Sequence, residues 1–573
     1  MIQNPTLPGF NPDPSIVRVG EDYYIATSTF EWYPGVQIHH SRDLANWRLA
    51  SRPLKRASQL NMLGAPDSCG VWAPCLTYAD GLFWLIYTDV KRYGRTSTGG
   101  ATGSASWRDF HNYLVTSPGI DGPWSDPVYL NSSGFDPSLF HDDDGRTYLL
   151  NQLWDHRPGG NRFAGIVLQE YSREERKLVG QRENISKGTP HGLTEAPHLY
   201  RRNGYYCLLT AEGGTGWNHG VTMARSRSLR GPYELHPDVS ILSARNRPDA
   251  PLQRAGHADL VDTPDGQTWM VYLCGRPLRN RGTCTLGRET AIQPMVWGED
   301  GWLRSRDGRG TPELRVEAPP LPEHRFPPEP VREDFDGSEL PPAFQWLRTP
   351  WPEEIFNLDA RPGHLRLFGR ESIGSQFRQA LVARRQAAHC YSAGTVVDFE
   401  PQHYQQAAGL VCYYGAAKFH YLYLSHDEEL GKHLRVMSSL PNHMQSDAFS
   451  APIPLPAGRP VELRVEVDEE RLLFGYRLGR NGSGWRTGSM PASCRTRHRR
   501  RDNRISPAPS WAWPARTWPE QACMPMSTGS ITANVHSRST RVRRPEAYWA
   551  GCQFPPPPCP ISHSSTCTLA SWP

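Results

Sequence analysis

Apolar residues in the first half of the chain come in short runs that begin directly after a turn. Each turn contains Asp-Gly, Asn-Gly or Glu-Asp, and the run after it is rich in aromatic and β-branched residues. A tight turn followed by such a run is typical of a β-hairpin. The five runs are "GEDYYIATS" at Tyr24, "ADGLFWLIYTD" at Trp84, "DDDGRTYLLNQ" at Tyr148, "RRNGYYCLLTAE" at Tyr206 and "PDGQTWMVYLC" at Trp269.

The aromatic residues of these runs recur at intervals of 60, 64, 58 and 63 residues. About sixty residues hold four short antiparallel strands and their loops, which is the content of one propeller blade. A β-sandwich with chance spacing is the alternative, but five regular units favour a propeller. We therefore predict an all-β chain in which residues 1–318 form a five-bladed β-propeller.

The second half of the chain shows a different strand pattern. A proline-rich linker is predicted at residues 319–333. Alternating apolar and polar residues over 334–480 then predict an antiparallel β-sandwich. Its strand-like patches are "HLRLFG", "GTVVDFE", "AGLVCYYG", "HYLYLS", "VELRVEV" and "RLLFGYRL".

Composition and charge narrow the class of protein. The net charge is +5, but residues 481–573 hold twelve arginines and three acidic residues, which leaves 51 basic and 55 acidic residues elsewhere. The basic charge therefore belongs to the end of the chain, and we predict no nucleic-acid partner. No run of 18 apolar residues exists, so we predict no membrane span. The N-terminus lacks the pattern of a secretory signal, which predicts a cytoplasmic protein with its 12 cysteines reduced.

Chemically active residues recur 11 or 12 positions before each aromatic residue of the repeat. The first strand of a blade lies nearest the propeller axis, so these residues are predicted to meet in one central space. Three of them are carboxylates, which are costly to bury together and point to a site rather than to structure. An acid and a base beside a pocket are the groups that cleave a glycosidic bond. The positions are Asp13, Trp72 with Ala73, Asp136, Glu195 and His257.

These phrases resemble a known family. "NPDPSI", "SCGVWAPCL", "GFDPSLF", "LTEAPHLY", "GHADLV" and "LGRETAIQP" are similar to motifs of glycoside hydrolase family 43, in its β-xylosidase branch, and the similarity runs from Asn4 to about Gly479. The resemblance implies a five-bladed propeller followed by a lectin-like sandwich. It also implies removal of xylose from the non-reducing end of xylo-oligosaccharides with inversion, with release of α-L-arabinofuranosyl groups as a further activity. An arabinan-degrading hydrolase of the same fold and a non-catalytic sugar-binding propeller are the alternatives.

The resemblance also implies roles for individual residues. Asp13 matches the general base and Glu195 the general acid. Asp136 matches the third carboxylate, which orients the acid and, when ionised, raises its pKa.

Further positions match the part of the pocket that binds the sugar. Arg288 matches an arginine that contacts sugar hydroxyls, with an ion pair to Glu289 as its alternative role. Phe30 and Trp72 match pocket aromatics, although core packing would explain both. His257 matches a histidine that meets a hydrated Ca²⁺ in some relatives, and a histidine bonded to its neighbours would look the same. The predicted partner is a xylo-oligosaccharide or arabinoside, no cofactor is required, and a homo-oligomer is left open.

The sequence changes character after residue 480. Proline, arginine, serine and tryptophan dominate residues 481–573, without a strand period. A disordered basic tail is one interpretation. A frameshift near Arg480 is the other, because codons compatible with residues 506–534, read one nucleotide earlier, can spell a string similar to the closing strands of this family's sandwich. On that hypothesis the sandwich is incomplete, and reading the gene across this point tests it.

Overall fold

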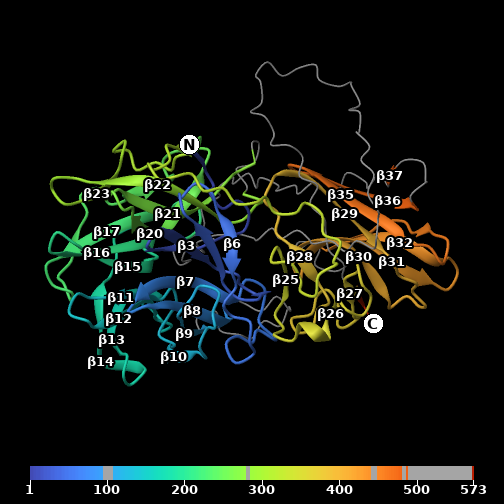
Figure 1. Cartoon of the computed structure of the whole chain (residues 1–573), viewed down its shortest axis with the longest axis horizontal. Helices are drawn as coiled ribbons and strands as arrows, with labels where there is room; N and C mark the ends of the chain where they lie inside the picture. The colour runs from blue at the N-terminus through green and yellow to red at the C-terminus, as the bar shows by residue number, and fades with distance from the viewer. Residues whose placement is uncertain (94–107, 279–283, 440–447, 480–484, 488–570, 573) are drawn as a thin grey trace, which may run out of the picture.

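The computed structural model describes residues 1–93, 108–278, 284–439, 448–479, 485–487 and 571–572. These residues form two β domains that lie side by side, a propeller and a sandwich (Figure 1). Within these ranges the only helical element is one 3-10 turn, η1 (Pro352–Glu354). No described helix has the length and apolar character needed to cross a membrane. Most of the 481–573 region, with its suspected frameshift, lies outside the described residues.

The propeller consists of five antiparallel sheets, each built from one continuous stretch of the chain. Most strands pair with the next strand in sequence, except that β4 pairs outside the first blade and β19 pairs with β17. Blade 1 contains β2 (Ser15–Val19), β3 (Asp22–Thr27), β5 (Gln37–Ser41) and β6 (Arg48–Ser51). Blade 2 contains β7 (Gly70–Ala79), β8 (Leu82–Arg92), β9 (Asp109–Ser117) and β10 (Val128–Asn131). Blade 3 contains β11 (Ser138–His141), β12 (Thr147–Trp154), β13 (Phe163–Ser172) and β14 (Lys177–Ser186). Blade 4 contains β15 (Glu195–Arg202), β16 (Tyr205–Glu212), β17 (Gly220–Ser226), β18 (Glu234–Leu235) and β19 (Leu242–Ser243). Blade 5 contains β20 (Gln253–Asp262), β21 (Thr268–Gly275), β22 (Glu289–Trp297) and β23 (Leu303–Ser305).

The predicted hairpins are confirmed, and each aromatic run of the repeat forms the second strand of a blade. Two of the turns show why the sequence folds locally in this way. The two residues between β7 and β8, Asp80 and Gly81, have φ angles of 52° and 75°, and those between β15 and β16, Asn203 and Gly204, have 49° and 74°. Positive φ at both central positions is the geometry of the tight hairpin turn that Asp-Gly and Asn-Gly favour.

The first strands of the five blades close a ring around the propeller axis. β2 contacts β7 and β20, β11 contacts β7 and β15, and β15 contacts β20. The buried carboxylate of Asp259 joins three blades at this ring, because it accepts hydrogen bonds from Ser15 Oγ (2.8 Å) and from the hydroxyl of Tyr200 (2.5 Å). Side chains from distant parts of the sequence therefore meet at the hub.

The N-terminal segment fastens the first blade to the last. β1 (Ile2–Gln3) pairs with β24 (Arg315–Val316), and the side-chain amide of Asn4 donates to the carbonyl oxygens of Ile292 (2.7 Å) and Glu313 (2.8 Å). These two bonds link residues that are 288 and 309 positions apart in the sequence. They therefore hold Asp13, a few residues further on, against blade 5.

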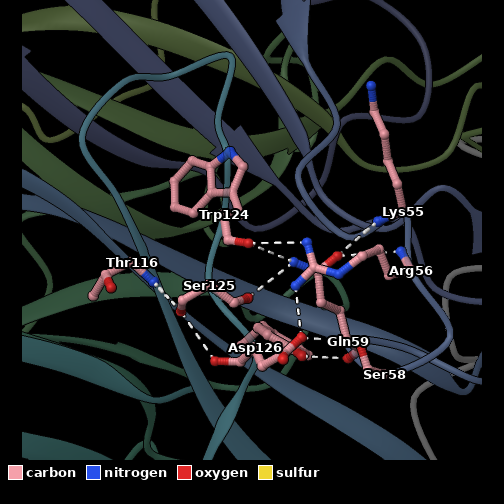
Figure 2. Close-up of polar contacts among 9 residues, drawn as sticks. Lys55, Arg56, Ser58, Gln59, Thr116, Trp124, Ser125 and Asp126 are labelled. Carbon is pink, nitrogen blue, oxygen red and sulfur yellow. Dashed lines mark hydrogen bonds and ion pairs between the residues drawn. The ribbon is translucent and has the colours of Figure 1, made fainter.

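The connector between blades 1 and 2 is tied to the turn before β10. Arg56 donates to the carbonyl oxygen of Trp124 (3.0 Å) and to Asp126 (2.6 Å), and Gln59 donates to the carbonyl oxygen of Ser125 (3.0 Å) (Figure 2). The connector then leads to Ser68 and to the start of β7. Its attachment fixes the approach to the strand that carries one of the predicted pocket aromatics.

The sandwich contains two antiparallel sheets. One sheet contains β29 (Cys390–Val397), β35 (Val461–Asp468), β36 (Arg471–Leu478) and β37 (Arg486–Thr487). The other contains β30 (Ala407–Gly415), β31 (Lys418–Asp427), β32 (Gly431–Ser439), β33 (Ala448–Phe449), β34 (Ile453–Pro454) and β38 (Ser571–Trp572). A hairpin of β26 (Phe356–Asn357) and β27 (Arg366–Leu367) precedes them. The predicted patches all contribute strand residues, whereas β32 was not among them.

A short sheet crosses the boundary between the two domains. β25 (Phe344–Leu347) pairs with β28 (Val382–Arg384) on one side and with β4 (Trp32–Tyr33) of the propeller on the other. The next residue, Arg348, is fully buried and forms an ion pair with Asp67 (2.7 Å). The sandwich is thus attached beside Phe30, at one side of the hub.

Candidate active site

Five residues, one from each blade, hold the same unusual backbone conformation at the hub. They have φ angles between 29° and 55°, and in four of them the next residue is proline. The five are Asp13, Ala73, Asp136, Ala196 and His257. At Ala73, Ala196 and His257 the pairing with the second strand also shifts register, as in a β-bulge, which re-aims side chains next to active sites.

This register refines the predicted alignment of the repeat. Asp13 and Asp136 occupy equivalent positions in their blades. In blade 4 that position belongs to Ala196, and Glu195 stands one residue before it. Glu195 is instead equivalent to Trp72, which also precedes a positive-φ alanine. Glu195, the predicted acid, is the first residue of β15, whereas Asp13 and Asp136 stand two residues before β2 and β11.

Asp13 is almost fully buried and is held by partners from two other segments. Its Oδ1 lies 3.0 Å from Nη1 of Arg288, and its Oδ2 accepts a hydrogen bond from Ser28 Oγ at 2.7 Å. Burial by itself raises the pKa of Asp13, but the charge of Arg288 and the Ser28 hydrogen bond help to outweigh it, so the pKa lies below its usual value. The Asp13 carboxyl is therefore ionised at neutral pH, as a general base must be.

Arg288 is oriented toward the hub and not toward its neighbour in the sequence. The alternative ion pair with Glu289 is not formed, because Glu289 binds Arg276 at 2.7 Å and the backbone N–H of Gly9 at 2.7 Å. The guanidinium of Arg288 lies 4.9 Å from the ring centroid of Phe30. Arg288 therefore lies between Asp13, the predicted base, and Phe30, a predicted pocket aromatic.

Asp136 and Glu195 are two buried carboxyl groups whose pKa values are both raised. Burial, together with the charge of Asp13, raises the pKa of Glu195 to about 8. Burial and the charges of Glu195 and Asp13 raise the pKa of Asp136 as well. The pair therefore retains a proton at neutral pH, which a general acid requires. That Asp136 is the ionised member of the pair stays a prediction.

One hydrogen bond connects Asp136 to the backbone of the acid. Asp136 Oδ2 accepts from the N–H of Ala196 at 3.1 Å. Since Ala196 directly follows Glu195, this bond helps to fix the position of the Glu195 main chain. The contact supports an orienting role for Asp136.

The predicted pocket aromatics lie together. The ring centroids of Phe30 and Trp72 are 5.8 Å apart, and the indole N–H of Trp72 donates to the carbonyl oxygen of Ser68 at 2.8 Å. Phe30 is buried, whereas Trp72 is only partly buried. Both rings thus adjoin the hub, with Trp72 the more accessible.

A second group of aromatics, which was not predicted, lies next to Trp72. Tyr93 and Phe135 have ring centroids 4.8 Å and 5.7 Å from that of Trp72, and Trp154 lies 6.2 Å from Tyr93. Burial and the charge of Glu195 raise the pKa of Tyr93 to about 12, which places Tyr93 near the acid. Phe135 directly precedes Asp136, and this adjacency was the available signal. No sequence signal pointed to Tyr93 or Trp154, because Tyr93 directly follows β8 and Trp154 ends β12, away from the repeated motif.

His257 lies beside the base, with Nδ1 at 3.7 Å from Asp13 Oδ1. Burial lowers the pKa of His257 to about 4, so its ring is neutral near pH 7 and Arg288 supplies the positive charge beside Asp13. Ca²⁺ takes six to eight oxygen ligands. No group of three or more His, Cys, Asp or Glu side chains in the described ranges is arranged to hold a metal. A hydrated Ca²⁺ that meets His257 at the hub therefore stays a prediction, and no step is assigned to a metal.

Comparison with known proteins bears on the identity of this site. The family model "Glycosyl hydrolases family 43" matches residues 2–303, and the model "Beta xylosidase C-terminal Concanavalin A-like domain" matches residues 332–498. The chain belongs to glycosyl hydrolase family 43. The resemblance found in its motifs is thereby confirmed.

Individual relatives cover most of this family 43 chain. It is 53% identical over 481 residues to xylosidase/arabinosidase 43B of Humicola insolens, which spans 83% of this chain and 87% of the relative. It is 50% identical to a β-xylosidase of Bacillus subtilis, over 83% of this chain and 89% of that one. The crystal structure of xylan β-1,4-xylosidase from Bacillus halodurans superposes with a TM-score of 0.82 at 51% identity, covering 86% of this chain and 91% of that chain.

Membership of family 43 establishes the class of reaction. The protein is a glycoside hydrolase, and the family hydrolyses with inversion of the anomeric configuration. A non-catalytic sugar-binding propeller is therefore excluded. The fold prediction is confirmed as well, since the family architecture is a five-bladed propeller with a concanavalin A-like sandwich.

Proposed function

We propose that this glycoside hydrolase removes xylose from the non-reducing end of xylo-oligosaccharides by a single displacement. The observation that carries the proposal is the opposite tuning of two carboxyls in one hub. The pKa of Asp13 is lowered while that of Glu195 is raised to about 8. Asp13 is thus ready to accept a proton and Glu195 to donate one at the same pH.

The mechanism assigns each proton. Water attacks the anomeric carbon and gives a proton to the Asp13 carboxylate, so the new C–O bond forms on the face opposite the leaving group. As the glycosidic C–O bond breaks, Glu195 gives its proton to the departing oxygen. Asp136 holds the main chain of the acid through the Ala196 N–H (3.1 Å). The net change consumes one water and releases xylose of inverted configuration.

The sugar specificity rests on the relatives and on the aromatic wall. Two relatives that match 83% of this chain are named xylosidase/arabinosidase and β-xylosidase. Phe30 and Trp72 provide flat apolar surfaces for a pyranose ring, and Arg288 provides donors for its hydroxyls. The sandwich, attached next to Phe30 through β25 and β4, supports a pocket for chain ends.

Hydrolysis of an aryl β-D-xyloside tests the proposal. The wild-type chain should release xylose, and Asp13→Ala should lose most of this activity. Glu195→Ala should also be slower, and its loss should grow as the leaving phenol becomes less acidic. Proton NMR during the first turnovers should show α-xylose from the β-xyloside. Equal rates in all three proteins, or retention of configuration, would contradict the assigned roles.

Release of α-L-arabinofuranosyl groups is a second activity of the same pocket in this proposal. The name xylosidase/arabinosidase of the Humicola insolens relative favours it. An aryl α-L-arabinofuranoside measured beside the xyloside tests it. A chain that cleaves the arabinoside and arabinan but no xyloside would instead be an arabinan-degrading hydrolase.

A further inference from the structure

An exposed tryptophan stands at the catalytic end of blade 4. Trp217 is 43% exposed and lies in the loop between β16 and β17. β15 begins at Glu195, which is paired with Ala211 near the end of β16, and Glu212 is paired with Gly220 at the start of β17. The loop that carries Trp217 therefore leaves the blade at the same end as the acid.

A second contact ties this loop to the segment that leads into Glu195. The N–H of Gly213 donates to the carbonyl oxygen of Gly192 at 2.8 Å. Glu212 accepts hydrogen bonds from the N–H of Thr189 (2.9 Å) and from Thr194 Oγ1 (3.3 Å). The position of Trp217 is thus coupled to the residues directly before the acid.

One face of the Trp217 indole is covered by a cation from blade 5. The guanidinium carbon of Arg254 lies 4.7 Å from the ring centroid. Arg254 itself is fixed, since it has φ +55° and its carbonyl oxygen accepts from Nδ1 of the buried His219 at 3.0 Å. The His219 ring packs against Gly256, where a Cβ atom would lie 2.4 Å from it. The indole is therefore held from one side, while much of its surface faces solvent.

The sandwich approaches the propeller from another side. Its described contacts include those to β4, to Asp67 and, through the carbonyl oxygen of Ala387, to Arg276 of blade 5. β16 and β17 lie on the side of the propeller away from the sandwich (Figure 1). A substrate whose terminal sugar enters the hub can thus extend over blade 4, past Trp217.

These relations define a sugar platform. We propose that Trp217 stacks against a xylose unit on the leaving-group side of the scissile bond, and that Arg254 is a positioning residue that orients the indole. The inference rests on the proposed xylosidase function. All hydroxyls of a β-xylopyranose ring are equatorial, so its two faces are lined with C–H groups that suit an indole face. A large aromatic surface also supplies much contact area with little side-chain entropy loss.

Binding without turnover tests the platform. In a Glu195→Gln background, titration calorimetry compares xylotriose with D-xylose, which occupies the hub alone. Trp217→Ala should weaken xylotriose binding about tenfold and leave D-xylose binding unchanged, whereas Trp217→Phe should retain most of the affinity. Arg254→Met should give an intermediate loss for xylotriose only. Tyr129→Ala, which removes an exposed aromatic on the outermost strand of blade 2, is the matched control.

Two results would overturn the inference: xylotriose affinity unchanged in Trp217→Ala, or an equal loss for xylotriose and D-xylose. The inference would also be overturned if xylotriose bound no better than D-xylose to the parent protein. Hydrolysis of methyl β-D-xyloside, whose leaving group is too small to reach the platform, reports separately on the proposed function. Tyr129→Ala should cleave it at the wild-type rate, and a wild-type chain that does not cleave it would contradict the proposed function.

Discussion

Nη1 of Arg288 lies 3.0 Å from Oδ1 of Asp13, across 275 residues of sequence. This ion pair keeps the base ionised inside a hub that also contains two carboxyl groups with raised pKa values. A buried charge pair of this kind is costly to break, because the remaining partner is left without compensation. In the proposed mechanism, this contact links sugar binding by Arg288 to the protonation state of Asp13.

The pH dependence of kcat/KM should show this tuning. Activity requires Asp13 ionised, and its lowered pKa places the acidic limb below the usual range of an aspartate. Activity also requires protonated Glu195, so the rate should fall as pH rises through about 8. Arg288→Met should move both limbs to higher pH, because the cation lowers both pKa values. Limbs that stay in place in this variant would contradict the finding.

The leaving group should separate the acid from the base. Glu195→Ala should slow xylobiose hydrolysis by about 10²–10⁴-fold, the range of general acid catalysis. It should slow an aryl xyloside with an acidic phenol much less, since that leaving group needs no proton. Asp13→Ala should slow both substrates alike, because both need the attacking water. Steady-state kinetics on the two substrates give this comparison, and the reverse pattern would exchange the roles.

Ser28 should matter both for stability and for the base. Its Oγ donates to Asp13 Oδ2 and accepts the N–H of Ala73 at 2.8 Å. Ser28→Ala leaves that buried N–H unpaired, so we expect the free energy of unfolding to fall by about 1–3 kcal/mol. The acidic limb of kcat/KM should also move to higher pH. Urea unfolding and pH profiles check the two effects, and Ser28→Thr, which keeps the hydroxyl, is the control.

The domain junction should make stability depend on pH. Burial raises the pKa of Glu31 to about 7 against the partial compensation of Arg348. A raised pKa in the folded state stabilises the fold fully below the unfolded pKa, and this contribution is lost as pH rises through about 7. We therefore expect the Tm to decrease between pH 5.5 and 8. Glu31→Gln should reduce this decrease of the Tm. An unchanged dependence of the Tm on pH in this variant would be evidence against the role of Glu31.

Removal of the buried Arg348 cation at the same domain junction should lower the free energy of unfolding. Arg348 binds Asp67 at 2.7 Å and donates to Gln379 Oε1 at 2.7 Å. We expect Arg348→Met to lower the free energy of unfolding by about 3–5 kcal/mol, because it leaves the partly buried Asp67 and the buried Glu31 without their cation. Calorimetric unfolding measures this loss. Arg361→Met, which removes an exposed partner of Asp398, should cost less than about 1 kcal/mol.

Local signals in the sequence were sufficient for the repeat. Asp80-Gly81 and Asn203-Gly204 code for two-residue turns that only one hairpin geometry satisfies, and the aromatic runs after them have the composition of strands. The recurrence of these units predicted the number of blades. β32 was not predicted, because no marked turn signal or aromatic run precedes it.

The sequence by itself determined the five-bladed hub and placed Asp13, Asp136 and His257 at equivalent positions in it, because turn chemistry and repeat spacing are local properties. Only the tertiary structure decided that Arg288 pairs with Asp13 instead of Glu289, that Glu195 stands one residue out of register, and that Tyr93 and Trp154 adjoin Trp72. These relations depend on bulges and on contacts between blades. Such contacts join residues far apart in the chain, so no local pattern records them.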